Sequence, residues 1–350
     1  MATVVHYPRH RDSPKTVARA WNVPARMGAF RNALYRHCWP TTGVLPTGNP
    51  DTIDAGNLNI WSNFDGYIST WDELIVAIPF GYSSVVKYAK PTTTWNGKVL
   101  IIKAGHDGDA LLSLPYQTVA LEALDRGYSV MAVSMPFQIV GNGFTGERTS
   151  GLPGGDVDMI GAASNSHNQF DQIEDAGQPT LPYFLEQIPR ALNWIIATYA
   201  PTDIYMTGLS GGGWGTFWAM AMDQRITKGY GVAGLMPAAI EDGNDHEHFL
   251  TRTGRPLNSI LGRQEEIFAL ASYKRRCYAI YNRNDFYYHS HNRSAAINSF
   301  VADVQGQLGN GKHGEFNWRE MAGGTDGVYS TDNHTYTSAC IDFIFTDMET

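Results

Sequence analysis

The stretch that most constrains this chain covers residues 203–220 and reads DIYMTGLSGGGWGTFWAM. It opens with a short apolar run typical of a buried strand, breaks at glycines around Ser210, and resumes as a helix-compatible segment. The pattern predicts a strand, a sharp turn and a helix, because Gly208 and Gly212 are small enough to let the two elements pass closely. Such a turn exposes the Ser210 hydroxyl. It also leaves the backbone N–H of Gly211 at a helix start, where it can stabilise an oxyanion.

A Gly-x-Ser-x-Gly pattern is short enough to recur by chance, so the surrounding elements decide its weight. Apolar runs of strand length recur along the chain, at residues 98–104, 128–134, 229–236, 277–281 and 316–321. A helix predicted over 115–126 joins the first two runs, and another over 181–199 leads into the strand before Ser210. Strand, helix and strand at this spacing imply right-handed crossovers and parallel pairs. We also expect a hairpin of residues 73–79 and 83–89, and a closing helix over 335–348.

The chain divides into two predicted parts. Residues 1–70 carry turn-forming residues without regular periodicity, and we expect an N-terminal extension or arm that caps the body. Residues 71–350 form the predicted catalytic domain. Within it, residues 136–179 are rich in Gly, Asn, Asp and Ser, and we interpret this long irregular segment as a lid or insert over the site.

The charge is unevenly distributed. The net charge is −8, yet residues 1–40 hold seven basic residues and one acidic residue, so the rest of the chain is strongly acidic. An acidic body disfavours nucleic acid as a partner, because phosphate backbones bind basic surfaces. Pro8, Pro14 and Pro24 interrupt any long amphipathic presequence helix, and the sequence has no apolar run of signal or membrane-span length. We therefore expect no membrane span and, by default, a cytoplasmic location.

Neither the cysteines nor the acidic loops carry a metal-binding pattern. Cys38, Cys277 and Cys340 are far apart and odd in number, so at most one disulfide is possible. The run 241–248, EDGNDHEH, resembles a metal cluster by composition, but no second ligand pair has the right spacing, and an acidic loop is the favoured interpretation. Calcium at the loop carboxylates of residues 107–109 and 156–158 is a minor alternative.

Nucleophilic catalysis by a serine needs a base and a group that orients the base, since the hydroxyl is a poor nucleophile at neutral pH. Asp285 follows the strand at 277–281, and His334 precedes the closing helix. The ends of parallel strands carry such groups to one edge of a sheet. The strand at 98–104 stops at residues 105–108, GHDG.

These features together resemble the α/β-hydrolase superfamily over roughly residues 70–350. Residues 208–212 match its nucleophile elbow, residues 105–108 (GHDG) are similar to its His-Gly oxyanion loop, and the order Ser210, Asp285, His334 is that of its triad. The resemblance implies a mostly parallel central sheet with helices on both faces. It also implies Ser210 as nucleophile, His334 as base and Asp285 as its orienting acid, with no metal or organic cofactor. Asp107 stands where the family usually has glycine, so the second oxyanion donor is His106 or Asp107, beside Gly211.

Other residues compete for two of these roles. His289 and His291 follow Asp285 too closely to be easy partners, and His313 precedes the last predicted strand instead of following it. Asp242 and Asp245 follow the preceding strand, a position that some members of the family use for the acid. Asp332, two residues before His334, is interpreted as a loop residue.

The function implied is hydrolysis of a carboxylic ester through an acyl-enzyme. The many aromatic residues, with loops rich in Asn and Gly, favour an acylated carbohydrate or another polar ester as substrate. A serine peptidase or amidase with the same triad is the main alternative, and a non-catalytic binding module with this fold is another. Nucleotide binding is disfavoured, because the Gly-rich turn at 211–213 lacks the GxGxxG spacing.

Overall fold

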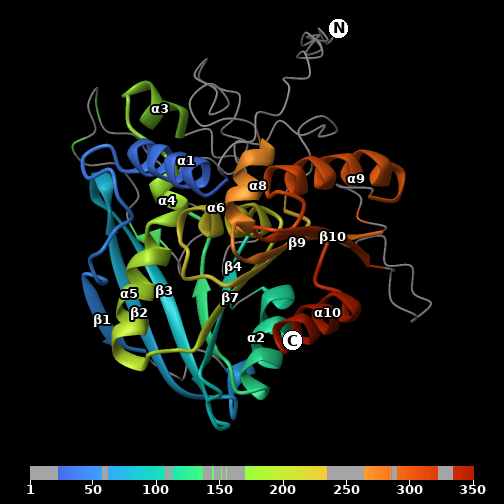
Figure 1. The fold of residues 1–350 in the computed structure, drawn as a ribbon. Coiled ribbons are helices and arrows are strands. Elements are labelled where there is room, and N and C mark those ends of the chain that lie inside the picture. Colours follow the sequence, from blue (N-terminus) through green and yellow to red (C-terminus); the bar gives the residue numbers. More distant parts are fainter. Residues whose placement is uncertain are drawn as a thin grey trace, which may run out of the picture.

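The structure is a computed structural model that describes residues 23–56, 62–106, 111, 113–136, 144–145, 151, 155, 170–234, 264–283, 285, 290–321 and 334–350. Within these ranges, ten strands form one sheet in the order β1-β2-β3-β5-β4-β7-β8-β9-β10, with β6 paired to β3 (Figure 1). The strands are β1 (Thr52–Ala55), β2 (Ile68–Ile78), β3 (Tyr82–Pro91), β4 (Lys98–Lys103), β5 (Ser129–Val133), β6 (Phe144–Thr145), β7 (Asp203–Leu209), β8 (Lys228–Val232), β9 (Arg276–Asn282) and β10 (Glu315–Met321).

The sheet is parallel over most of its width. The pairs from β5 through β4, β7, β8 and β9 to β10 are all parallel, whereas β1, β2, β3 and β6 add antiparallel pairs at one side. β4, β5 and β7 are almost fully buried along their length, as expected of strands covered on both faces. The predicted strands and the hairpin of β2 and β3 are thus confirmed, and the carboxyl ends of β4, β7 and β9 meet at one edge.

Helices cover both faces of the sheet, as predicted (Figure 1). One face carries α1 (Val23–Cys38), α3 (Phe170–Asp175), α4 (Leu181–Leu185), α5 (Gln187–Tyr199), α6 (Gly211–Met222), α8 (Gln264–Ser272) and α9 (Ser290–Gln307), and the other carries α2 (Leu114–Asp125) and α10 (Ser338–Met348). Two short 3-10 turns, η2 (Ser62–Phe64) and η3 (Pro79–Gly81), flank β2. Each face has its own buried apolar cluster, so the sheet separates two cores.

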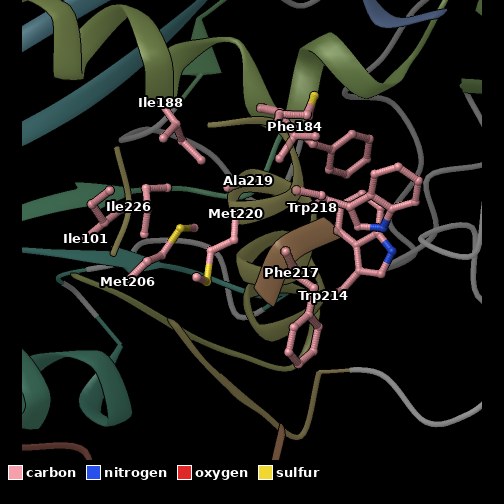
Figure 2. Packing of buried hydrophobic residues seen from close by; sticks show 14 of the residues in the cluster. Ile101, Phe184, Ile188, Met206, Trp214, Phe217, Trp218, Ala219, Met220 and Ile226 are labelled. Carbon is pink, nitrogen blue, oxygen red and sulfur yellow. The ribbon is translucent and has the colours of Figure 1, made fainter. Parts of the chain in front are cut away.

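Helix α6 lies at the centre of the larger core. Every one of its residues is buried. Figure 2 shows Trp214 and Trp218 beside Phe184 of α4, with ring centroids 5.8 Å apart for the Trp pair and 5.4 Å apart for Trp214 and Phe184. Because the helix that follows Ser210 is enclosed on all sides, its first turn is a rigid support for whatever that serine does.

The N-terminal region contains a helix that the sequence patterns do not predict. α1 begins at Val23, and Pro24 falls in its first turn, where a proline is tolerated. Pro24 thus lies at the start of a helix and not within one. Four buried side chains recur at helical spacing: Met27, Arg31, Leu34 and Cys38. Because Arg31 is charged, the sequence lacks a continuous apolar stripe that would predict the helix. α1 packs against α6 and α8.

Side chains of α1 donate hydrogen bonds to the last backbone carbonyl groups of α6. Arg31 Nε donates to the Ala221 carbonyl at 3.0 Å, and Tyr35 Oη donates to the Met222 carbonyl at 2.6 Å. Arg275, from the turn before β9, donates to the Asp223 carbonyl at 2.7 Å and to Met220. The last carbonyls of a helix have no partner within the helix, and cations there also complement its dipole. The α1 helix therefore stabilises the helix that carries the elbow.

Replacement of Arg31 by methionine is expected to lower the free energy of unfolding by about 1–3 kcal/mol, because the buried Ala221 carbonyl loses its charged donor. Urea denaturation followed by circular dichroism measures this. Arg36→Met, on the exposed side of the same helix, is the matched control and should change the midpoint little. Equal midpoints for the two variants would contradict the capping role.

Two predicted segments differ from the structure in their detail. The helix predicted over 181–199 is split into α4 and α5 at Glu186, because Pro189 has no N–H to donate to the carbonyl four residues earlier. The segment 136–179 was predicted to lack regular structure, but its described parts include β6 and α3. Phe170 of α3 is buried, with its ring centroid 5.0 Å from that of Phe184, so this end of the segment belongs to the core. The remaining residues of the predicted lid lie outside the described ranges.

All three cysteines are buried free thiols. Burial raises the pKa of each, to about 12 for Cys277 and further for Cys38 and Cys340, so the reactive thiolate is scarce at neutral pH. The native protein should therefore react negligibly with a thiol reagent at pH 8. The urea-unfolded chain should react at all three cysteines, with three equivalents of reagent per chain. Fast reaction of a thiol before unfolding would contradict this packing.

Among the helices within the described ranges, none has the length and apolarity needed to cross a membrane.

Candidate active site

The turn between β7 and α6 has the strained backbone expected of a nucleophile elbow. Ser210 lies between the last residue of the strand and the first of the helix with φ 58° and ψ −128°, a conformation that costs energy in any residue with a Cβ. The surrounding backbone fixes it: the Ser210 N–H donates to the Val232 carbonyl at 2.9 Å, and the Ser210 carbonyl accepts from Gly213 N at 2.8 Å. Ser210 is partly exposed, so the strained turn leaves its side chain accessible.

Glycines make this turn possible because backbone passes directly over them. A Cβ at Gly208 would lie 2.1 Å from the Gly212 carbonyl oxygen, and a Cβ at Gly212 would lie 1.9 Å from the Lys103 carbonyl oxygen of β4. No side chain fits at either position. The predicted close passage of strand and helix is confirmed, and it extends to the neighbouring strand.

The loop after β4 lies directly against the elbow. A Cβ at Gly105 would be 2.6 Å from the Leu209 carbonyl oxygen, 3.0 Å from Ser210 Cβ and 3.1 Å from Gly211 N. The next residue, His106, therefore begins a loop that adjoins both the serine and the start of α6. The N–H of Gly211, at the first position of α6, lies at the positive end of the helix dipole. Asp107, the other predicted donor, lies outside the described residues.

A carboxylate and an imidazole pair at the same edge of the sheet. Asp285, three residues beyond β9, has no exposed surface, and its Oδ2 lies 2.9 Å from Nδ1 of His334. The His334 side chain is 12% exposed. A carboxylate bonded to Nδ1 fixes the tautomer and ring orientation and stabilises the imidazolium, which leaves Nε2 to exchange protons. Two residues separated by 48 others along the chain thus form one hydrogen-bonded pair.

Asn282 holds this pair in place. It is the last residue of β9 and is fully buried. Its carbonyl accepts from Asp285 N at 3.1 Å, its Nδ2 donates to the Thr335 carbonyl at 2.7 Å, and its Oδ1 accepts from Thr337 Oγ1 at 3.3 Å. The backbone and side chain of this one residue therefore tie the loop of the acid to the residue that follows His334. Sequence patterns gave no signal for it, because an asparagine at a strand end is common.

The competing residues fall elsewhere or outside the described ranges. His313 lies before β10, and β10 runs parallel to β9, so His313 is at the opposite edge of the sheet from Asp285. Asp242, Asp245, His289 and Asp332, together with the side chain of His291, lie outside the described residues.

The predicted loop carboxylates at 107–109, 156–158 and 241–248 also lie outside the described ranges. Within those ranges, no three His, Cys, Asp or Glu side chains are grouped so that they could hold a metal ion.

No protein-family model matches the sequence, and a search of curated proteins finds no match. Solved structures do resemble it. The structure of methylesterase BT1017 aligns with 93% of this chain at 17% identity and a TM-score of 0.58, and this chain spans 64% of that protein. A CE15 glucuronoyl esterase from Teredinibacter turnerae aligns with 93% of this chain and 84% of its own at 13% identity and a TM-score of 0.55. Acetyl xylan esterase 1 from Thermoanaerobacterium sp. aligns over 92% of both chains at 14% identity and a TM-score of 0.51. At such identities the likeness concerns the fold.

Proposed function

We propose that this chain, which has the α/β-hydrolase fold, is a serine esterase that cleaves a carboxylic ester through an acyl-enzyme. The observation that carries the proposal is the contact of the fully buried Asp285 carboxylate with His334 Nδ1, at the same sheet edge as the strained Ser210 turn. A buried carboxylate on an imidazole and a serine held at positive φ are each costly arrangements. Nucleophilic catalysis explains why both occur at one edge.

The proposed reaction proceeds in two halves. Nε2 of His334 takes the proton of Ser210 as Oγ bonds to the ester carbonyl carbon, and the N–H of Gly211, with one from His106 or Asp107, binds the oxyanion. The tetrahedral intermediate then collapses, and the alcohol leaves with the proton from His334. Water, deprotonated by His334, next attacks the acyl-enzyme, which releases the acid and restores Ser210. Asp285 orients His334 and stabilises its charged form throughout, and no step needs a metal or organic cofactor.

An ester of a carbohydrate is the proposed substrate class. The three structural neighbours above are named for methyl, glucuronoyl and acetyl xylan esters, and this supports the class without identifying the acyl group. A serine peptidase or amidase would use the same residues, because the same triad cleaves amides. A non-catalytic module would keep the fold without a competent nucleophile.

A substrate panel separates these possibilities. The purified chain would be assayed with acetylated xylan, a methyl ester of glucuronic acid, p-nitrophenyl acetate and octanoate, and matched acyl p-nitroanilides. We expect kcat/KM for the preferred ester to exceed that for the matched anilide at least about tenfold. Faster cleavage of the anilides would favour the amidase, and turnover of none of them would contradict the proposal.

A further inference from the structure

Tyr116 lies between the loop after β4 and the end of β7, the two segments that lead to the proposed oxyanion donors. It belongs to α2, on the face of the sheet opposite α6, and it has no exposed surface. Its hydroxyl accepts a hydrogen bond from Gly105 N at 2.7 Å and donates one to the Leu209 carbonyl at 3.4 Å. One oxygen atom therefore bridges the loop after β4 and the last residue of β7.

The two bridged residues lie one or two positions before the groups proposed to bind the substrate carbonyl. Gly105 precedes His106, and Leu209 precedes Ser210, whose neighbour Gly211 supplies the other N–H. The loop and the elbow lie so close that a Cβ at Gly105 would be 3.0 Å from Ser210 Cβ. The Tyr116 hydroxyl is hydrogen-bonded to both segments and so limits how far the two backbones can separate.

Packing immobilises Tyr116 itself. Its ring meets that of Tyr336 edge to face, with centroids 6.1 Å apart and planes at 74°. Tyr336 is also buried, and its hydroxyl lies 3.1 Å from Thr207 Oγ1 of β7. Tyr336 follows His334 by two residues, so the same contacts run from the oxyanion loop through the elbow strand to the histidine segment. A buried hydroxyl held this way is a fixed spacer.

We infer that Tyr116 is a positioning residue that sets the separation of the oxyanion donors, an inference that rests on the proposed function. It touches no substrate. Its effect should appear in the transition state, because a small misplacement of an N–H donor weakens the bond to the oxyanion more than the binding of the neutral ester.

Tyr116→Phe tests this with little change of shape. The hydroxyl is lost, and the bridge between Gly105 N and the Leu209 carbonyl is lost with it. We expect kcat for p-nitrophenyl acetate to fall about ten- to a hundredfold with KM nearly unchanged, and the affinity for phenylboronic acid, which mimics the tetrahedral intermediate, to fall by a similar factor. Hydrogen exchange of the Gly105 amide should become faster in the variant.

Tyr183→Phe is the matched control. Tyr183 is also fully buried, and its hydroxyl donates to the Pro79 carbonyl at 3.2 Å, so Tyr183→Phe likewise removes a hydrogen bond of a buried tyrosine. Both variants should lower the melting temperature, but only Tyr116→Phe should change kcat and boronate affinity. If the wild type is active and Tyr116→Phe has the same kcat, the inference is overturned and the proposed function is not. Equal losses of kcat in Tyr116→Phe and Tyr183→Phe would overturn it in the same way. A wild-type chain that hydrolyses no ester would overturn the proposed function and this inference with it.

Discussion

Replacement of Ser210 by alanine is expected to lower kcat for ester hydrolysis by at least about a thousandfold, because the proposed acyl-enzyme forms on the Ser210 hydroxyl. The melting temperature should stay close to that of the wild type, since alanine keeps the Cβ and loses only a hydroxyl that makes no capping hydrogen bond to α6. Initial rates on p-nitrophenyl acetate and thermal denaturation by circular dichroism measure the two quantities.

The control for this variant is Ser69→Ala, which removes an exposed serine hydroxyl on β2. Its kcat should match the wild type. Substantial turnover by Ser210→Ala would remove Ser210 from the mechanism, whereas loss of both turnover and the folded state would show that the substitution acts on the fold.

Gly212→Ala should be the most destabilising single substitution at the elbow. The added methyl group would lie 1.9 Å from the Lys103 carbonyl oxygen, and neither the strand nor the helix can move aside, because both are buried along their length. We expect the free energy of unfolding to fall by more than about 3 kcal/mol, at or beyond the upper end of ordinary overpacking. Urea titration of the purified variant, or its failure to accumulate as folded protein, reports the effect.

Gly28→Ala supplies the comparison. Gly28 is inside α1, and a Cβ there would meet nothing within 4 Å. Alanine should therefore raise the helix propensity and stabilise the protein by up to about 1 kcal/mol. A Gly212→Ala variant that unfolds at the wild-type midpoint would contradict the close packing of Gly212 against β4.

The sequence was sufficient to predict the parallel half of the sheet and the elbow. Strands such as β4 and β7 are buried on both faces, so they appear as continuous apolar runs, and the glycines around Ser210 mark a turn that other residues cannot form. The positions of Asp285 and His334 also followed from the sequence, because each lies next to an element that is itself clearly patterned.

Other features depend on contacts that no local pattern encodes. α1 went unrecognised because its buried stripe contains Arg31, whose partners are carbonyls about 190 and 239 residues away. α9 has only a weak apolar stripe, with Ile297, Phe300 and Val304 buried, and was not predicted at all. Tyr116 and Asn282 are ordinary core residues by sequence, and only the folded chain shows which backbone groups they bind.

Covalent labelling tests the central claim, that Ser210 is an activated nucleophile, most directly. The wild-type chain would be incubated with a fluorophosphonate, and intact mass spectrometry with peptide mapping would count and locate the adducts. One phosphonyl group on Ser210 is predicted for the wild type, none for Ser210→Ala, and labelling at a greatly reduced rate for His334→Ala, because the imidazole activates the hydroxyl. A folded wild-type chain that acquires no adduct, or an adduct that persists in Ser210→Ala, would contradict the account.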